Sequence, residues 1–239
     1  MDNLINGLTD NGLLREINED SFFFKEEEKN FVIVVSDGMG GHNAGDVASE
    51  TVVSSIKEFC ENENIYDNPE KKIRLAFLQA NEKVFFRSCA DKNTKGMGAT
   101  AVMAVGVGDT VYIGNVGDSR AYISDKENIH LITEDHSYVN ELVKNGMITE
   151  EEARVHPRKN EILKAVGIGK DVFPDIFSTI LKEGDVLLLC TDGLTNMVTD
   201  SEIYEIINSD DNVSEITEKL VKTANDNGGL DNITVVLRK

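Results

Sequence analysis

The chain has 239 residues, which is enough for one domain with a sizeable core or for two small domains. It carries 24 lysine and arginine residues against 43 aspartate and glutamate residues, so its net charge is −19. This balance argues against a nucleic-acid partner and against binding to an anionic membrane, because both need cationic patches on the protein. It is compatible with the binding of divalent cations.

The first sixteen residues show no basic region followed by an apolar core, and no apolar run approaches the length of a membrane span. We therefore expect no signal peptide and a cytoplasmic location. The cysteines Cys60, Cys89 and Cys190 stand at wide spacings in apolar surroundings. We expect them to be small buried hydrophobic residues in a reducing compartment, not disulfide or zinc-binding residues.

Apolar runs at 21–25 and 31–35 flank the polar turn 26–30 and predict a β-hairpin. Residues 45–60 carry apolar side chains at helical spacing, which predicts an amphipathic helix. A second helix is expected to begin at Pro69, because proline suits the first turn of a helix. The chain is thus expected to begin with two strands followed by two helices.

Three short strands are expected at 99–105, 110–115 and 120–124, with glycine–aspartate pairs at the reversals between them. They predict a β-meander and therefore a sheet that is at least partly antiparallel. The remaining elements are expected to be a charged, broken helical segment at 137–165, a buried strand at 185–190, helices at 201–208 and 213–225, and a final strand at 232–237. Because strands and helices come in separate blocks, the predicted fold class is α+β, in one domain covering residues 1–239.

Four aspartates stand where predicted core strands begin or end: Asp20, Asp37, Asp192 and Asp231. If these strands are neighbours in one core, their ends bring four carboxylates together, and like charges would raise some of their pKa values and destabilise the fold. Divalent cations remove this conflict, and oxygen ligands without histidine or cysteine favour Mg²⁺ or Mn²⁺ over zinc. The alternative is that Asp-Gly is simply a common turn dipeptide. Four occurrences favour the metal site, and a carboxylate that bridges two ions can activate water against a phosphoryl group.

Six motifs in order along nearly the whole chain carry a family resemblance. They are REINEDS (15–21), VSDGMGGH (35–42), GMGAT (96–100), GNVGDSRA (114–121), CTDGL (190–194) and GGLDNITV (228–235). Together they resemble the metal-dependent protein Ser/Thr phosphatases, the PPM or type-2C family, and residues 135–160 resemble its compact bacterial members. The resemblance implies a four-layer α-β-β-α sandwich of two antiparallel sheets flanked by helices, with a metal site at one end.

The resemblance also implies the ligands of two Mn²⁺ or Mg²⁺ ions. Asp37 would bridge both ions, with the Gly38 carbonyl on one of them, and Asp192 and Asp231 would bind the other. Two further acids, Glu19 and Asp20, would act mostly through metal-bound waters. Asp118 matches the residue that, together with Asp192, helps to hold a third and weaker ion.

Arg15 matches the family position that grips the substrate phosphate, and a bidentate guanidinium contact suits that role. The alternative is a surface ion pair with a neighbouring acid such as Glu16. Animal members often have histidine, a candidate acid for the leaving group, where this chain has Met39. His42 is nearby and could take that role, although a structural or solvated role is equally compatible with the sequence. His136 is expected to support a helix start beside Asp135.

The activity implied by the resemblance is hydrolysis of phosphoserine and phosphothreonine in proteins, and the expected partners are a bacterial Ser/Thr kinase and its substrates. A water held between the two metals would attack phosphorus in line, with no phosphoenzyme. A cysteine phosphatase would need a C-x5-R loop, which the sequence lacks. We expect a monomer. The charges of segment 137–165 (Glu150, Glu151, Glu152, Arg154, Arg158 and Lys159) could sort substrates, or the segment is simply a solvated helical excursion.

Three other functions remain as alternatives. A phosphatase for one dedicated regulator would usually carry additional sensor domains, for which this chain has no room. A metal-free binding module is disfavoured because every acid expected at the metal site is present. A phosphatase for small molecules stays open.

Overall fold

The computed structural model describes residues 4–40 and 44–239, and its strands form two sheets in which all the pairings are antiparallel. The first, called the β10 sheet, has the order β1-β11-β10-β7-β8; the second, called the β3 sheet, has the order β2-β3-β5-β6-β9, with β4 beside β3. The β10 sheet consists of β1 (Ile5–Asp10), β7 (Arg120–Ser124), β8 (Ile129–Leu131), β10 (Val186–Cys190) and β11 (Ile233–Arg238). The β3 sheet consists of β2 (Asp20–Glu27), β3 (Asn30–Met39), β4 (Gly98–Ala99), β5 (Ala101–Val107), β6 (Thr110–Val116) and β9 (Asp175–Ile180).

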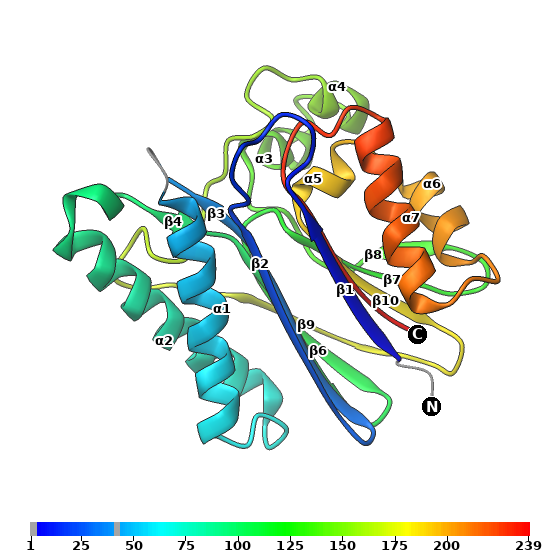
Figure 1. The fold of residues 1–239 in the computed structure, drawn as a ribbon, viewed down its shortest axis with the longest axis horizontal. Helices are drawn as coiled ribbons and strands as arrows, with labels where there is room; N and C mark the ends of the chain where they lie inside the picture. Colours follow the sequence, from blue (N-terminus) through cyan, green and yellow to red (C-terminus); the bar gives the residue numbers. More distant parts are fainter. Residues whose placement is uncertain (1–3, 41–43) are drawn as a thin grey trace.

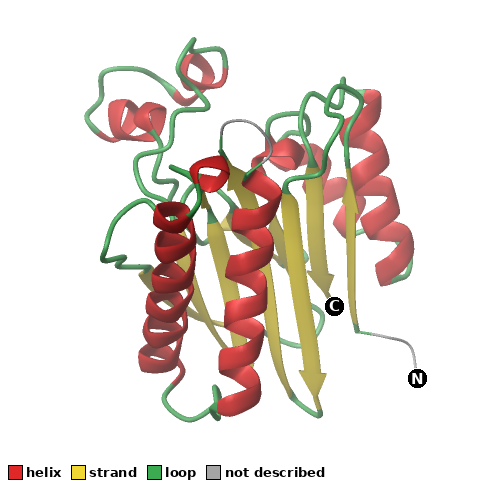
Figure 2. Cartoon of the chain, turned by 60° about the vertical axis from the view of Figure 1, so that its left-hand side comes forward, coloured by secondary structure: helices red, strands yellow, loops and turns green. Residues whose placement is uncertain are grey.

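Helices cover the outer face of each sheet (Figure 1). The β3 sheet is covered by α1 (Gly45–Asn62) and α2 (Pro69–Ala90), which stand side by side in front of the strands in Figure 2. The β10 sheet is covered by α5 (Asp192–Thr195), α6 (Asp200–Ile207) and α7 (Val213–Asp226). A 3₁₀ turn η1 (Lys92–Thr94) follows α2, and α3 (Tyr138–Lys144) and α4 (Glu150–Arg154) lie in segment 137–165. The predicted α-β-β-α sandwich is confirmed.

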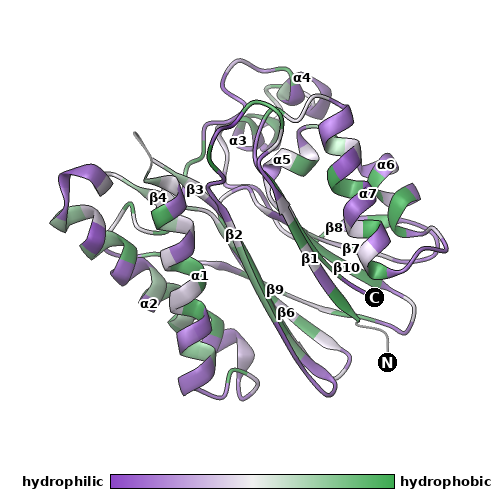
Figure 3. Ribbon diagram, viewed as in Figure 1, coloured by the Kyte–Doolittle hydropathy of each residue, from purple (hydrophilic) through white to green (hydrophobic). Residues whose placement is uncertain are grey.

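The central strands bury side chains on both faces of their sheets, since alternate residues of a strand point in opposite directions. In β3, Ile33 and Val35 pack between the two sheets, whereas Val32 and Val34 pack against α1 and α2. In β10, Leu189 packs between the sheets. Figure 3 shows hydrophobic colouring along the strands of both sheets. Apolar burial in three successive layers therefore holds the sandwich together.

The predicted β-meander is wrong at its third strand. β5 and β6 form a hairpin in the β3 sheet, but β7 pairs with β10 and β8 in the other sheet. The change of sheet occurs at Gly117, whose φ of +107° is a conformation that other residues rarely adopt. The place beside β6 is taken instead by β9.

Three strands were not predicted: β1, β8 and β9. All three lie at sheet edges, where one side of the strand lacks a neighbour and the apolar pattern is weaker.

The expectation that the three cysteines are buried is right only for Cys190; Cys60 is partly buried and Cys89 is exposed. Across residues 4–40 and 44–239, no helix has both the length and the apolar composition needed to span a membrane.

We predict that Leu189→Ala, which opens a cavity between the two sheets, lowers the free energy of unfolding by about 2–5 kcal/mol. The matched control Leu78→Ala changes a leucine that is 44% exposed on α2, and it should alter stability by less than about 0.5 kcal/mol. Urea unfolding monitored by circular dichroism measures both values. Equal losses in the two variants would contradict the proposed packing between the sheets.

Candidate active site

Two of the predicted site acids face each other across the β2–β3 hairpin. Asp20 is the first residue of β2 and is paired in register with Asp37 of β3. Asp37 lies inside β3 and does not end it, because the strand continues to Met39. The Gly38 amide donates a hydrogen bond to the Glu19 carbonyl at 2.9 Å. The hairpin thus brings Glu19, Asp20, Asp37 and Gly38 together.

The other two aspartates lie just outside strands of the β10 sheet. Asp192 begins the short helix α5, directly after β10, and Asp231 lies two residues before β11. The Thr191 hydroxyl donates to the Asp20 carboxylate at 2.8 Å and accepts from the Thr234 amide at 3.0 Å. This hydroxyl therefore links the two sheets at the place where the acids meet.

Asn232 fixes the loop that carries Asp231. Its side-chain amide donates to the carbonyls of Asn11 and Ile17, both at 3.0 Å, and its side-chain oxygen accepts from the Glu19 amide at 2.8 Å. Sequence reasoning missed Asn232 and Thr191. The available signal was a small polar residue directly beside a strand-end aspartate.

Two glycines allow the close approach of backbone segments around the acids. A Cβ on Gly38 would lie 1.9 Å from the Gly45 carbonyl oxygen at the start of α1, and a Cβ on Gly193 would lie 1.9 Å from the Asn232 carbonyl oxygen. Neither contact is possible for a larger residue. The glycines therefore let α1 and α5 reach the centre of the site.

Burial and mutual repulsion raise the pKa values of four of these carboxyl groups. Burial is the largest cause in each case; it raises the pKa of Asp20 to about 7 and that of Asp192 to about 6, and the charge of Asp231 adds to both shifts. The pKa values of Asp37 and Asp118 are raised well above their usual range by burial, with repulsion from neighbouring aspartates. The bare carboxylates therefore oppose one another and need positive charge nearby.

The donor set fits a hard divalent cation. Asp20 Oδ1 is buried and has no hydrogen-bond partner, so a ligand for this oxygen is missing from the protein itself. The converging groups are carboxylates, which suit Mg²⁺ or Mn²⁺. Among the described residues, no three His, Cys, Asp or Glu side chains are arranged to enclose an ion by themselves. Other oxygen ligands, such as the Gly38 carbonyl, would have to complete the coordination.

Arg15 lies at the edge of this cluster with its side chain 46% exposed. Its Nη2 donates to Asp231 Oδ2 at 2.9 Å, and its Nη1 lies 4.0 Å from Glu19 Oε2. Arg15 therefore does form an ion pair, which was the alternative interpretation of the sequence, but its partner is Asp231 and not Glu16. His42, the predicted acid, lies outside the described residues.

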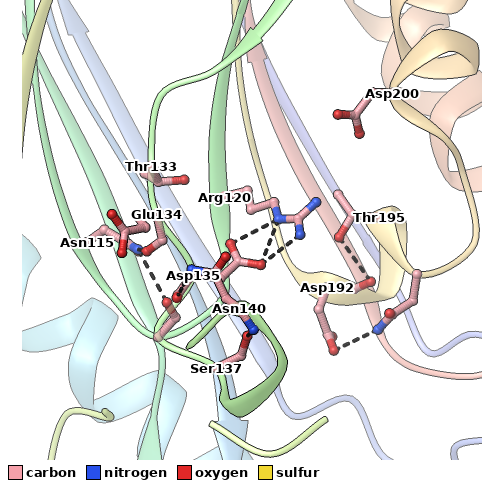
Figure 4. Close-up of polar contacts among 12 residues, drawn as sticks. Asn115, Arg120, Thr133, Glu134, Asp135, Ser137, Asn140, Asp192, Thr195 and Asp200 are labelled. Carbon is pink, nitrogen blue, oxygen red and sulfur yellow. Dashed lines mark hydrogen bonds and ion pairs between the residues drawn. The ribbon is translucent and has the colours of Figure 1, made fainter. Parts of the chain in front are cut away.

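Asp118 lies in the turn between β6 and β7, where it borders a cleft of about 360 Å³ together with Asp192. Figure 4 shows Arg120 in this cleft, turned toward Asp135, whose carboxylate it binds at 2.7 Å. The opposite wall is built by segment 137–165, with Val139, Asn140, Val143, Glu150, Ala153, Arg154 and Lys159. Half of the six charges expected to sort substrates thus line the cleft.

The family model described as "Protein phosphatase 2C" matches residues 15–238. The chain belongs to the protein phosphatase 2C family. This confirms the resemblance carried by the six motifs, and membership makes the chain a Ser/Thr protein phosphatase, a hydrolase of phosphoproteins.

Relatives in several bacteria agree with this membership. The chain is 40% identical over 233 residues to "Serine/threonine phosphatase stp" of Listeria innocua, covering 96% of this chain and 92% of the relative. It is 39% identical over 232 residues to "Protein phosphatase PhpP" of Streptococcus pneumoniae, covering 96% and 94%. The crystal structure of Stp1 from Staphylococcus aureus superimposes with a TM-score of 0.93 at 39% identity, covering 98% of this chain and 93% of that one.

We predict that the metal-free protein loses stability as the pH rises from about 4 to about 8. The folded state holds a proton on Asp20 up to about pH 7, whereas the unfolded state releases it near the ordinary value of 3.8, so deprotonation favours unfolding. Asp20→Asn removes this charge and should reduce the loss between pH 5 and pH 8 by about 1–3 kcal/mol. Urea unfolding in EDTA measures the change. Asp210→Asn, at an exposed position, is the control; equal slopes for all three proteins would contradict the prediction.

Proposed function

We propose that this phosphatase hydrolyses phosphoserine and phosphothreonine by direct attack of water at a two-metal centre. The observation that carries the proposal is the convergence of four carboxyl groups with raised pKa values, two of them buried (Asp20 and Asp118) and two half-buried (Asp37 and Asp192), with one Asp20 oxygen left without a partner. When bound, the ions would supply an attacking water of lowered pKa and positive charge against the phosphate oxygens. No covalent intermediate with the protein is then required.

The chain's own residues would hold the two ions from both sheets. Asp37 would bridge them, with the Gly38 carbonyl on one and with Asp192 and Asp231 on the other. Two acids on the hairpin side, Glu19 and Asp20, would act mostly through bound waters, and Asp118 with Asp192 would hold a third ion. The raised pKa values support these roles, because a group that resists carrying its charge in the bare protein becomes a ligand once positive charge compensates it.

Arg15 would exchange one partner for another during the reaction. In the structure its guanidinium binds the Asp231 carboxylate, a proposed metal ligand. Once a cation occupies that carboxylate, the exposed guanidinium is available to a phosphate, which it can bind through two parallel hydrogen bonds. The position of Arg15 at the rim of the acid cluster supports this role.

The cleft beside Asp118 and Asp192 would receive the phosphorylated segment of the substrate. Its volume of about 360 Å³ is enough for a side chain and its neighbours. Arg154 and Lys159 lie on the wall formed by segment 137–165 and carry the sign of charge that favours a phosphate group. We propose that this segment sorts substrates; its replacement without any change in substrate preference would contradict that role.

The identity of the group that protonates the leaving alkoxide stays a prediction. Met39 ends β3 and cannot donate a proton, and His42 lies outside the described residues. The natural targets are proposed to include a Ser/Thr kinase and its substrates, in line with the bacterial relatives. The cytoplasmic location and the monomeric state also remain predictions.

We predict that a phosphothreonine peptide is hydrolysed with Mn²⁺ or Mg²⁺ but not in EDTA. Asp192→Ala removes a proposed ligand shared by two ion sites and should lower kcat by at least about 100-fold, because a catalytic metal supplies several kcal/mol. Asp210→Ala, at an exposed position between α6 and α7, should retain the activity of the wild type. Release of inorganic phosphate measures both. A folded wild type without turnover in either ion would favour the binding-module alternative.

We predict that Arg15→Ala lowers kcat/KM for the same peptide by about 10- to 100-fold, mainly through KM, since a charged phosphate contact is lost. Arg15→Lys keeps the charge but not the bidentate geometry and should recover only part of this loss. Arg87→Ala, in the last turn of α2, is the control. If Arg15→Ala behaves like Arg87→Ala, Arg15 is only the ion-pair partner of Asp231.

A further inference from the structure

Four consecutive residues, Thr133 to His136, hold the turn that carries Asp118. The Thr133 hydroxyl accepts from the Ala121 amide at 3.1 Å, the Glu134 carbonyl accepts from the Asn115 side chain at 3.0 Å, and the Asp135 carboxylate binds Arg120 at 2.7 Å (Figure 4). His136 completes the series at Gly117, the residue directly before Asp118. The stretch 133–136, which leads into segment 137–165, thus runs along the turn between β6 and β7 and holds it by hydrogen bonds and an ion pair.

His136 holds the Gly117 backbone from both sides. Its buried ring accepts a hydrogen bond from the Gly117 amide at Nδ1 (3.1 Å), and its own amide donates to the Gly117 carbonyl (3.0 Å). A Cβ on Gly117 would lie 2.6 Å from the Thr100 side chain, and the φ of this residue is +107°. Since the position cannot carry a side chain, the backbone is the only part of Gly117 by which the turn can be held.

These contacts define which ring nitrogen carries the proton. A backbone amide only donates, so Nδ1 of His136 is the unprotonated nitrogen and Nε2 carries the hydrogen. Nε2 then donates to Asp175 Oδ2 at 3.1 Å, at the start of β9. Lys164 Nζ lies 3.1 Å from Nε2 and 3.4 Å from the other oxygen of Asp175, so this ammonium group is a cationic neighbour of the ring as well as of the carboxylate. The ring is therefore oriented by the Gly117 amide on one side and by Asp175, with Lys164 beside it, on the other.

His136 also stands at the base of segment 137–165. Its carbonyl accepts from the Leu163 amide at 2.7 Å, and the next pair, Tyr138 with Glu161, is joined at 2.8 Å. The two ends of the segment therefore meet at His136. The role predicted from the sequence, support of a helix start, belongs to Ser137, whose side chain accepts from the Asn140 amide at the start of α3.

We propose that His136 is a positioning residue that holds Asp118 through the Gly117 amide and couples a cation bound at Asp118 to the placement of segment 137–165. This inference rests on the proposed metal role of Asp118. The ring joins three parts of the structure: the Gly117–Asp118 turn, the paired ends of segment 137–165, and β9. The turn, through Asp118, and the segment both border the cleft. A cation that binds the Asp118 carboxylate restricts the position of the Gly117–Asp118 turn, and His136 links this turn to segment 137–165 by hydrogen bonds.

Two substitutions of similar size test the two hydrogen bonds of the His136 ring separately, because each keeps one bond and removes the other. In His136→Asn, the side-chain oxygen can take the place of Nδ1 and accept from Gly117, but the contact with Asp175 is lost. In His136→Gln, the longer amide reaches the place of Nε2 and can donate to Asp175, but the acceptor for Gly117 is lost. Both variants lose one buried hydrogen bond of the ring, so a general loss of packing affects them alike.

The first measurement is Mn²⁺ binding to the whole protein by isothermal titration and by electron paramagnetic resonance. We expect His136→Gln to weaken the weakest Mn²⁺ site by about 10-fold or more, the usual cost of losing a partner that orients a metal ligand, and His136→Asn to stay within about 3-fold of the wild type. The second measurement is the rate of trypsin cleavage at Arg154 and Arg158. Mn²⁺ should slow this cleavage in the wild type and in His136→Asn, but not in His136→Gln.

Thermal unfolding without metal shows whether the two variants are equally stable. Equal Mn²⁺ affinities for Asn and Gln, or trypsin cleavage that responds to Mn²⁺ equally in both, would overturn the role of His136. Mn²⁺ binding by a wild type that does not hydrolyse the phosphothreonine peptide would remove the proposed function and leave the His136 comparison valid. A wild type that binds no Mn²⁺ would overturn both.

Discussion

The hydrogen bond from Thr191 to Asp20 joins the two sheets at the place where the carboxylates converge. Thr191 directly follows β10 and Asp20 begins β2, so this contact ties the half of the site carried by the β10 sheet to the half carried by the β3 sheet. The Thr234 amide fixes the same hydroxyl from β11. The packing of the two sheets and the positions of the acids are therefore coupled, because a shift of one sheet relative to the other would also move the acids relative to one another.

The convergence of these carboxyl groups destabilises the metal-free fold, and this electrostatic cost is consistent with a metal site. Burial disfavours the charges of Asp20, Asp37, Asp118 and Asp192, and repulsion from neighbouring aspartates raises their pKa values further. A protein selected only for stability would replace such groups by apolar residues. Apolar layers on both sides of each sheet offset the cost, and glycines at positions such as Gly38 let the backbone approach closely enough for the acids to meet.

Segment 137–165 is attached to this centre through a short path of hydrogen bonds. The residues that precede it bind the turn of Asp118, and its two ends pair with each other beside His136. The cleft lies between this segment and the acids. One wall is therefore formed by segment 137–165, which is proposed to sort substrates, and the other by proposed metal ligands. The Gly117–Asp118 turn would thus take part both in metal binding and in placing the segment that selects substrates.

The sequence by itself determined the elements with strong local patterns and the acids of the site. The hairpin before α1, the two long helices, α6, α7 and β10 follow from periodicity, and Asp37, Asp192 and Asp231 stand out beside buried strands, because these signals depend on neighbouring residues. Only the tertiary structure decided which sheet receives β7 and which edge strands form. It also paired Arg15 with Asp231, 216 positions away, and placed His136 against Gly117. Such contacts depend on how distant segments pack, and no local pattern contains that information.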